Sequence, residues 1–330
     1  MKPLLSITIP TYNRPNNLKG LYLKFLSKIS YKFDYEIEII ICDNSDSDCA
    51  AINKEVFKNS KVKYMKNQSN IGYSGNLIRC LKEAKGEYVW VVSDDDTVDL
   101  EAFNRFMGWL KNKDTRDVDA IMLPFQNGES RLNQRQVINT FKEWRSSKSG
   151  IQLHQMVKNS LNIPFILFSS VIVKNDCVKS HNILDSVQNK FLNNDFIQIP
   201  LFSELIGKHG WVEFYTESLQ QYQPPKYVRF AMFRMVKSLE EVLRHMTSFF
   251  SLSEMEYESI YLQGCYRRWM RWLIQDRVGV LKVKDAKEVR WLLIRKWWFM
   301  HFNNLINTRL FLLNIMPVFL LKKIYKLKKI

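Results

Sequence analysis

The chain of 330 residues is 46% hydrophobic and 25% charged, a composition typical of a folded protein and unlike that of a disordered one. Its five cysteines and five histidines show no CxxC spacing and no clustering, which argues against zinc sites and disulfides and favours a reducing compartment. The net charge of +16 is uneven: residues 1–225 hold 28 Lys and Arg against 25 Asp and Glu, whereas residues 226–330 hold 21 against 8. This change predicts two regions, 1–225 and 226–330.

The first hundred residues alternate between strand and helix patterns. Short runs rich in β-branched and aromatic residues predict strands, and apolar residues at helical spacing predict helices. The expected strands cover 4–9, 35–42, 62–65 and 86–92, with Pro10 ending the first of them. The expected helices cover 18–26, 49–59 and 76–85. This alternation predicts an α/β fold with a mostly parallel sheet.

Polar residues follow every one of these strands, at 11–14, 43–46, 67–76 and 94–96. Ligands of parallel sheets bind beyond the carboxyl ends of the strands, so we expect a site there. The absence of GxxxxGK[ST] and GxGxxG from the sequence argues against a P-loop and a dinucleotide fingerprint. Taken singly, each loop is also explained by ordinary turn chemistry, because Asn, Asp, Gly and Ser dominate turns.

Three consecutive carboxylates, Asp94, Asp95 and Asp96, follow the strand expected at 86–92. Adjacent anions repel one another, so a counter-charge is expected, and oxygen ligands suit Mg²⁺ or Mn²⁺. In an extended backbone alternate side chains share a face, so Asp94 and Asp96 would point together and Asp95 away from them. The alternative is a solvated acidic turn that caps a helix beginning near Val98.

The pattern after Asp96 is weaker. Residues 120–124 favour an edge strand, 125–150 a polar loop or insertion, and 164–173 a central strand. Asp195 precedes an apolar helical segment at 196–207, and a carboxylate in that place is a common helix N-cap.

The pattern of the C-terminal region predicts long helices in which Trp alternates with Arg, followed by a basic amphipathic helix at 309–330. The longest apolar run there, 310–321, is too short to cross a bilayer, which needs about 20 residues. We expect this region to bind an anionic membrane surface. Two alternatives are a helical pair packed on the first region and a nucleic-acid surface, and we predict no nucleic-acid partner.

Four segments together resemble the successive motifs of family 2 glycosyltransferases. They are LSITIPTYNRP (5–15), EIIICDNSDSD (38–48), NIG (70–72) and KGEYVWVVSDDD (85–96). Their order and spacing match the family, and the acidic triplet with the NIG element most resembles enzymes of bacterial O-antigen and capsule synthesis, including abequosyl- and rhamnosyltransferases. The resemblance implies the GT-A fold, a Rossmann-like, mostly parallel sheet flanked by helices, here with a helical C-terminal extension.

The resemblance also implies roles for individual residues. Nucleotide-sugar-binding residues are implied at Pro10, Thr11, Tyr12, Arg14, Asp43, Asn70, Gly72, Asn76, Asp94 and Asp95. Within this set, Asp43 matches the carboxylate that accepts a hydrogen bond from the base. Asp96 and Asp94 match the ends of the DxD motif, which holds Mn²⁺ or Mg²⁺. Asp195 matches the general base, with the N-cap as the alternative.

Together with the single proposed base, the resemblance implies an inverting, metal-dependent glycosyltransferase that moves one sugar from a nucleotide-diphosphate sugar to a lipid-linked glycan acceptor in bacterial surface polysaccharide synthesis. The QxxRW motif of the family's processive members is absent, which favours single addition. Because the N-terminal apolar run is too short for a secretory signal, we expect a cytoplasmic enzyme, peripheral on the inner face of the cell membrane.

The sequence leaves two alternative functions. The first is a non-catalytic glycan- or membrane-binding protein on a transferase fold, against which the intact acidic triplet speaks. The second is a sugar-nucleotide nucleotidyltransferase, which would carry a glycine-rich loop after the first strand, whereas TYNRPNN contains no glycine.

Overall fold

The computed structural model describes residues 2–112, 118–127, 151–160, 167–179, 182–222, 232–261, 267–279, 285–299, 312–321 and 324. The chain divides into two compact units. The first comprises Met1–Met156 and Pro164–Gln223, and the second comprises Val157–Ile163 and Pro224–Ile330. The division after Gln223 lies close to the boundary predicted at 225.

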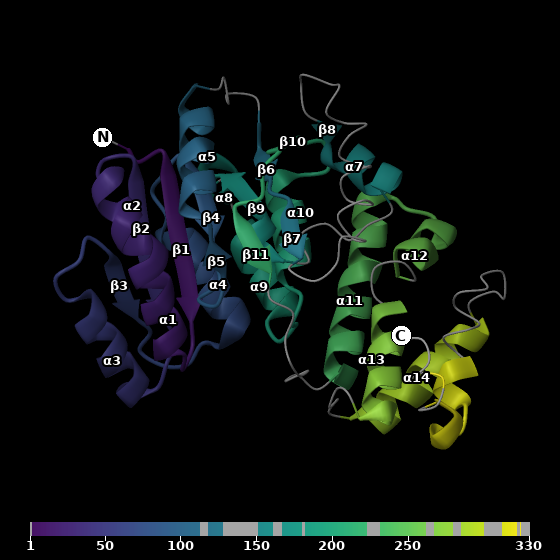
Figure 1. Ribbon diagram of the computed structural model, residues 1–330. Coiled ribbons are helices and arrows are strands. Elements are labelled where there is room, and N and C mark those ends of the chain that lie inside the picture. The colour runs from purple at the N-terminus through teal and green to yellow at the C-terminus, as the bar shows by residue number, and fades with distance from the viewer. Residues whose placement is uncertain are drawn as a thin grey trace. The chain divides into compact units, whose positions relative to one another are not determined.

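An eight-stranded sheet forms the core of the first unit, in the order β3-β2-β1-β4-β9-β6-β10-β8 (Figure 1). Its strands are β1 (Leu5–Thr11), β2 (Ile37–Asp43), β3 (Lys63–Lys66), β4 (Tyr88–Val91), β6 (Ala120–Met122), β8 (Ile151–Gln152), β9 (Val171–Lys174) and β10 (Trp211–Phe214). Strands β3, β2, β1 and β4 pair in parallel, as do β6 and β10, while β9 and β8 run antiparallel to their neighbours. The predicted, mostly parallel sheet is confirmed.

A second, three-stranded sheet has the order β5-β11-β7. Its strands are β5 (Thr97–Val98), β7 (Phe125–Asn127) and β11 (Gln220–Tyr222). Strand β7 takes up the start of the loop predicted at 125–150, and residues 128–150 lie outside the described part of the chain.

Helices connect the strands of the first unit. They are α1 (Pro15–Leu21), which continues through the π-helical turn η1 (Tyr22–Leu26) into α2 (Ser27–Lys32), then α3 (Ser47–Phe57), α4 (Gly72–Glu83), α5 (Leu100–Asn112), α8 (Asn175–Lys179), α9 (Ile183–Phe191) and α10 (Gln198–Ile206). Helix α7 (Leu153–Ser160) begins in this unit, and the 3-10 turn η2 (Phe168–Ser170) precedes β9.

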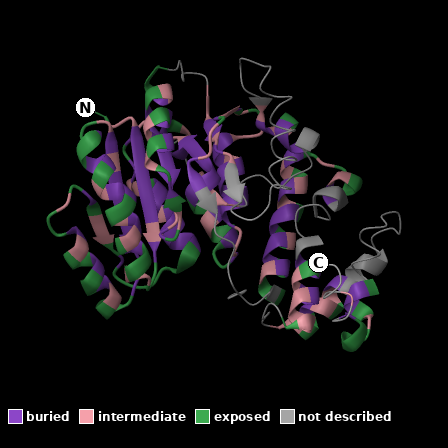
Figure 2. Ribbon diagram, in the orientation of Figure 1, coloured by how far each residue is buried: buried purple, intermediate pink, exposed green. Residues whose placement is uncertain are grey.

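The two faces of the sheet are covered by different helices. On one face Leu5, Ile7 and Ile9 of β1 join the main apolar core with side chains of α1, α2 and α5, whose outer faces are exposed (Figure 2). On the other face Cys42 of β2 packs with Cys80 of α4. This burial of both faces explains why β4, with the sequence YVWV, is a continuous apolar run rather than an alternating one.

Gly86 is required for the entry into β4. A Cβ atom at Gly86 would lie 2.6 Å from the backbone nitrogen of Ser6. The Gly86 N–H donates to Ser6 Oγ at 2.7 Å and to Glu38 Oε1 at 3.0 Å. This close packing fixes β4 against β1, and with it the acidic triplet that follows.

The expectation that Pro10 ends the first strand is wrong. β1 continues to Thr11, with Pro10 opposite Cys42 of β2. Pairing with β4 extends only to Thr8, so the missing N–H of Pro10 costs no ladder hydrogen bond on that side.

The second expectation to fail is the edge strand at 120–124, because β6 lies between β9 and β10. The central strand predicted at 164–173 is confirmed in place, but it begins only at Val171. Residues 164–166 lie outside the described part of the chain.

The second unit is helical where it is described, as predicted. Its helices are α11 (Met232–Phe250), α12 (Glu254–Tyr261), α13 (Arg267–Val278) and α14 (Ala286–Phe299). Trp269 on α13 is buried, whereas Trp291 on α14 is exposed, so part of the aromatic pattern serves packing and part of it faces solvent. No helix within the described residues is both long and apolar enough to cross a membrane.

The single helix predicted at 309–330 is wrong for the described residues. Helical backbone covers 312–315 and 318–321 and is interrupted at Met316 and Pro317. Proline disfavours helical backbone in the residue before it. The guanidinium of Arg277 donates to the carbonyls of Leu313, Asn314 and Met316, which satisfies acceptors that a helix end leaves open.

Candidate active site

The acidic triplet lies in a turn at the carboxyl end of β4. The strand ends at Val91, the Asp96 N–H donates to the Ser93 carbonyl at 3.2 Å, and the Ser93 N–H donates to Asp96 Oδ2 at 3.0 Å. The extended backbone expected at 94–96 is therefore wrong, because the chain reverses as soon as the sheet pairing stops. We call residues 93–96 the carboxylate turn.

Within the carboxylate turn, Asp94 and Asp95 both form ion pairs with the guanidinium of Arg14. Nη1 of Arg14, from the loop after β1, lies 3.0 Å from Asp94 Oδ1 and 3.0 Å from Asp95 Oδ2. Asp94 is only 3% exposed, and its Oδ2 also accepts a 2.6 Å hydrogen bond from Thr11 Oγ1. Burial raises the pKa of Asp94 to about 6, against the opposing effects of Thr11 and Arg14.

Asp96 lies against a different part of the unit. Burial raises the pKa of Asp96 to about 6 as well, although the Ser93 N–H and the Ser169 hydroxyl both favour its charged form. Ser169 belongs to η2, and its carbonyl accepts a 2.9 Å hydrogen bond from the indole of Trp90 on β4. The sequence did not single out Ser169 as a partner of Asp96, because 73 positions separate them along the chain.

The alternative that the carboxylate turn caps the next helix is also wrong. Helix α5 begins at Leu100, after the short strand β5. Asp99 caps it, since the Ala102 N–H donates to Asp99 Oδ1 at 2.9 Å and the Phe103 N–H donates to the Asp99 carbonyl at 3.0 Å.

The residues of the carboxylate turn fit a hard divalent cation that brings further ligands with it. The donors that meet there are carboxylate and hydroxyl oxygens, the ligands that Mg²⁺ and Mn²⁺ prefer. Among the described residues no group of three or more His, Cys, Asp or Glu side chains could enclose a metal ion. Two carboxylates are nevertheless sufficient for a cation that completes its coordination with substrate phosphates and water.

Asp43, at the end of β2, is fully buried and surrounded by donors. Its carboxylate accepts hydrogen bonds from the Ser45 N–H at 2.7 Å, from Asn53 Nδ2 at 2.8 Å and from the Tyr64 hydroxyl at 2.6 Å. Burial, reinforced by Asp43, raises the pKa of Tyr64, so its phenol stays a donor. Asp43 thus fixes the loop at 43–46, and its contact with a nucleotide base stays a prediction.

An asparagine network joins the ends of β1, β2 and β3 to the start of α4. Its members are Asn44, Asn67, Asn70 and Asn76. Asn67 Nδ2 donates to Asn44 and Asn76 at 2.9 Å each, and the Asn76 amide in turn donates to the Cys42 carbonyl at 2.9 Å. Asn76 is buried, so the structure shows it holding backbone in place.

The remaining residues predicted to bind the nucleotide lie in these loops or at the end of β1. Asn70 Oδ1 accepts the Gly72 N–H at 2.9 Å, and Gly72 has a φ of 72°, which favours glycine. Pro10 forms part of β1, while Tyr12 is exposed in the loop that follows. Thus the carboxyl ends of β1, β2, β3 and β4 do bring the predicted loops together.

Asp195 lies in the turn between α9 and α10, and this turn is held by the Phe196 N–H donating to Asn194 Oδ1 at 2.8 Å. The N-cap position of α10 belongs to Ile197, two residues after Asp195, and the role of Asp195 stays a prediction. Asp195 neighbours Tyr73 in the first turn of α4: burial of the hydroxyl and the Asp195 charge raise the pKa of Tyr73.

Tyr73 therefore contacts one residue near Asp195 and another beside Ser169, the partner of Asp96. Its hydroxyl donates to Gln198 Oε1 at 3.1 Å, three residues after Asp195, and its ring lies 6.4 Å from that of Phe168 beside Ser169. Sequence reasoning missed Tyr73, since an aromatic residue in a helical pattern is read first as packing.

Comparison with known proteins identifies the family. The model of Glycosyl transferase family 2 matches residues 6–174, more than half of the chain. The chain belongs to this family. The resemblance drawn from the four sequence motifs is confirmed.

Two curated relatives are similar over shorter stretches. The abequosyltransferase RfbV of Salmonella typhimurium is 34% identical over 100 residues, 29% of this chain and 29% of that protein. The GalNAc(5)-diNAcBac-PP-undecaprenol beta-1,3-glucosyltransferase of Campylobacter jejuni is 32% identical over 108 residues, 32% of this chain and 34% of that protein. The chain thus spans about a third of the length of each of these two relatives.

Solved structures match the chain over nearly its whole length. S. aureus TarS 1-349 in complex with UDP-GlcNAc has a TM-score of 0.59 at 15% identity, covering 99% of this chain and 92% of that chain. The mannosyltransferase PcManGT from Pyrobaculum calidifontis in complex with GDP-Man and Mn²⁺ has a TM-score of 0.54 at 12% identity, covering 100% and 88%. At such identities the likeness concerns the fold, and the predicted GT-A fold is confirmed.

Proposed function

We propose that the chain transfers a single sugar, with inversion, from a nucleotide-diphosphate sugar to a lipid-linked glycan acceptor in bacterial surface polysaccharide synthesis. The observation that carries the proposal is the carboxylate turn at the end of β4, in which Asp94 contacts Thr11 and Arg14 and Asp96 accepts the Ser93 N–H. Asp195 lies beside Tyr73. Tyr73 is in the first turn of α4, within the segment 70–76 that we assign to donor binding.

For the donor side, Asp96 and Asp94 would hold Mn²⁺ or Mg²⁺, which would neutralise the charge that develops on the leaving diphosphate. The loops at 10–14 and 70–76 would bind the nucleotide and its diphosphate, with Asp43 and the asparagine network fixing their positions. Support comes from two structural neighbours, one in complex with UDP-GlcNAc and one with GDP-Man and Mn²⁺.

For the acceptor side, Asp195 would remove the proton from the attacking hydroxyl. One base, without a second carboxylate acting as nucleophile, allows direct displacement at the anomeric carbon and therefore inversion. The lipid-linked acceptor is supported by the Campylobacter jejuni relative, whose name specifies an undecaprenol-linked substrate.

A thermal-shift screen tests this proposal. Purified protein is heated with UDP-, GDP-, dTDP- and CDP-sugars, each with and without Mn²⁺. We expect one nucleotide class to raise the melting temperature by several degrees, and only when Mn²⁺ is present, because ligand binding to the folded state stabilises it by mass action. No shift with any nucleotide would favour the non-catalytic alternative.

The described part of the C-terminal segment supports attachment to the inner face of the cell membrane. Five apolar side chains are exposed there: Leu312, Ile315, Val318, Phe319 and Leu320, with Phe319 at 72%. In the sequence they are followed by Lys322, Lys323, Lys326, Lys328 and Lys329. Each lysine near an anionic bilayer contributes about 1 kcal/mol, to which burial of these apolar groups would add.

Flotation with anionic liposomes tests the attachment. The full chain should float at low salt and less so at high salt, since salt screens surface charge. Phe319→Ser should weaken flotation severalfold, whereas Met255→Ser, at an equally exposed apolar position in the same unit, should not. A full-length chain that stays at the bottom of the gradient at low salt would contradict membrane binding.

A further inference from the structure

Arg14 forms ion pairs with the carboxylate turn and extends from an anchored loop. The preceding residue, Asn13, has a φ of 53° and is clamped to the β2 loop. Its N–H donates to Ser45 Oγ at 2.8 Å, its Nδ2 donates to Asp46 Oδ2 at 2.7 Å, and its Oδ1 accepts the Asp46 N–H at 2.9 Å. The backbone at Arg14 is therefore held, while the side chain is 36% exposed.

The two ion pairs of Arg14 differ in their surroundings. Asp94 is almost completely buried, whereas the side chain of Asp95 is 51% exposed. A buried carboxylate without a counter-charge is costly, so the pair with Asp94 matters in the absence of ligands. An exposed pair contributes little, so Arg14 can leave Asp95 at small cost.

We propose that Arg14 is an internal counter-ion for Asp94 that competes with a bare divalent cation and moves to the diphosphate once cation and nucleotide are both bound. The inference rests on the proposed function and deepens it. A guanidinium beside Asp94 and a divalent cation on the same carboxylate repel each other. The same guanidinium is suited to bidentate contact with phosphate oxygens, which arrive with the nucleotide.

The consequence is that removing Arg14 has effects of opposite sign on two binding steps. Without the guanidinium, Mn²⁺ alone should bind more tightly, because its competitor is gone. Mn²⁺ together with a nucleoside diphosphate should bind less tightly, because a charged contact to the diphosphate is lost. In the native chain Arg14 thus makes cation binding dependent on the nucleotide.

The experiment uses the full chain with Arg14→Gln, Arg14→Lys and the control Arg105→Gln. Arg105 forms an exposed ion pair with Glu217, at 2.9 Å between Arg105 Nε and Glu217 Oε2, and has no place in the site. Mn²⁺ binding is followed by electron paramagnetic resonance, first with Mn²⁺ alone and then with UDP, GDP, CDP and dTDP in turn. Circular dichroism melts establish that each variant is folded.

For Arg14→Gln we expect Mn²⁺ alone to bind about threefold more tightly or better. With the nucleotide that the native chain prefers, binding should weaken about tenfold to a hundredfold, the value of one charge-assisted hydrogen bond. Arg14→Lys keeps the charge and should lie between Arg14→Gln and the native chain, while Arg105→Gln should match the native chain in both steps.

The outcomes separate this inference from the proposed function. If the native chain binds Mn²⁺ and nucleotide together but Arg14→Gln leaves the affinity for Mn²⁺ alone unchanged or lower, the counter-ion role is wrong and the proposed function stands. If the native chain binds no Mn²⁺ with any of the four nucleotides, both are wrong. Should Arg14→Gln not fold, Arg14→Lys decides through the same two affinities.

Discussion

Two aspartates at the same edge of the sheet differ in how far the surrounding protein compensates their charge. Asp43 follows β2 and is saturated by three donors from the protein, whereas Asp94 follows β4 and meets one hydroxyl and the guanidinium of Arg14. Burial raises the pKa of Asp94 in spite of these partners, and it raises the pKa of Asp96 in spite of the Ser93 N–H and the Ser169 hydroxyl. A carboxylate that the protein compensates fully organises a loop, and one that it compensates in part is suited to a ligand.

The largest expected effect concerns the carboxylate turn, where the protein compensates the charges only in part. Asp96→Asn removes one ligand charge without changing shape, so metal-dependent turnover of the nucleotide sugar should fall about a hundredfold to a thousandfold. Stability should be kept or improved, because burial disfavours the charge that is removed. Turnover and thermal melts are measured on the same preparation. Near-native turnover at saturating Mn²⁺ would remove Asp96 from the metal site.

Asp195→Asn should give the next largest effect. A general base contributes about a hundredfold or more to the rate, so turnover should fall by at least that factor while nucleotide affinity stays unchanged. The matched control is Asp185→Asn on α9, which removes an exposed ion pair with Lys82. A loss of nucleotide affinity equal to the loss of turnover would place Asp195 on the donor side instead.

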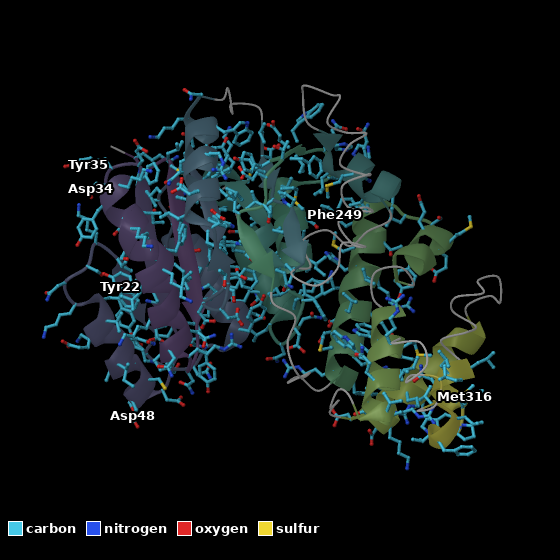
Figure 3. All side chains as sticks on the ribbon, viewed as in Figure 1. Tyr22, Asp34, Tyr35, Asp48, Phe249 and Met316 are labelled. Carbon is cyan, nitrogen blue, oxygen red and sulfur yellow. The ribbon has the colours of Figure 1, made fainter. Side chains whose placement is uncertain are left out.

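For Asp43, whose charge the protein compensates fully, the effect of substitution should appear in stability. Asp43→Asn leaves at least one donor without its charged acceptor, so the free energy of unfolding should fall by about 1.5–3 kcal/mol in urea titrations. The control is Asp48→Asn in the first turn of α3, an exposed aspartate (Figure 3). Unchanged stability with weakened nucleotide binding would mean that Asp43 faces the ligand.

Tyr73→Phe should have the smallest effect. It keeps the ring against Phe168 and removes only the hydroxyl that donates to Gln198, a neutral hydrogen bond worth about 1 kcal/mol. Turnover should fall about fivefold, with nucleotide affinity unchanged. Tyr35→Phe, at the exposed tyrosine labelled in Figure 3, should have no effect. Equal turnover in the two variants would separate Tyr73 from the Asp195 turn.

The sequence predicted the order of elements well, because buried parallel strands are short apolar runs between helices of clear period. It failed where the outcome depends on which neighbours a strand has. Pro10 is tolerated inside β1 because β4 has already stopped, and β6 is interior because β10 pairs with it. Neither fact can be read from the local pattern.

The sequence predicted the polar loops of the site but not the side chains that hold these loops in place. Asn53 and Tyr64 reach Asp43 through the packing of α3 and the register of β3, in which Tyr64 lies opposite Ile41. A signal for Asn53 exists in retrospect, since it is a polar residue between Ala50 and Phe57 on the buried face of α3. The contact of Ser169 with Asp96 has no such local signal, because 73 positions separate the two residues along the chain.

The most direct test of the central claim compares the melting temperatures of the native chain, Asp96→Asn and Asp43→Asn, each with nucleotide, with Mn²⁺ and with both. The account predicts that Asp96→Asn melts like the native chain or higher and loses the shift that Mn²⁺ and nucleotide produce together. Asp43→Asn should melt lower and still show a shift. The reverse, a lost shift in Asp43→Asn and a retained one in Asp96→Asn, would contradict the assignment of the two carboxylates.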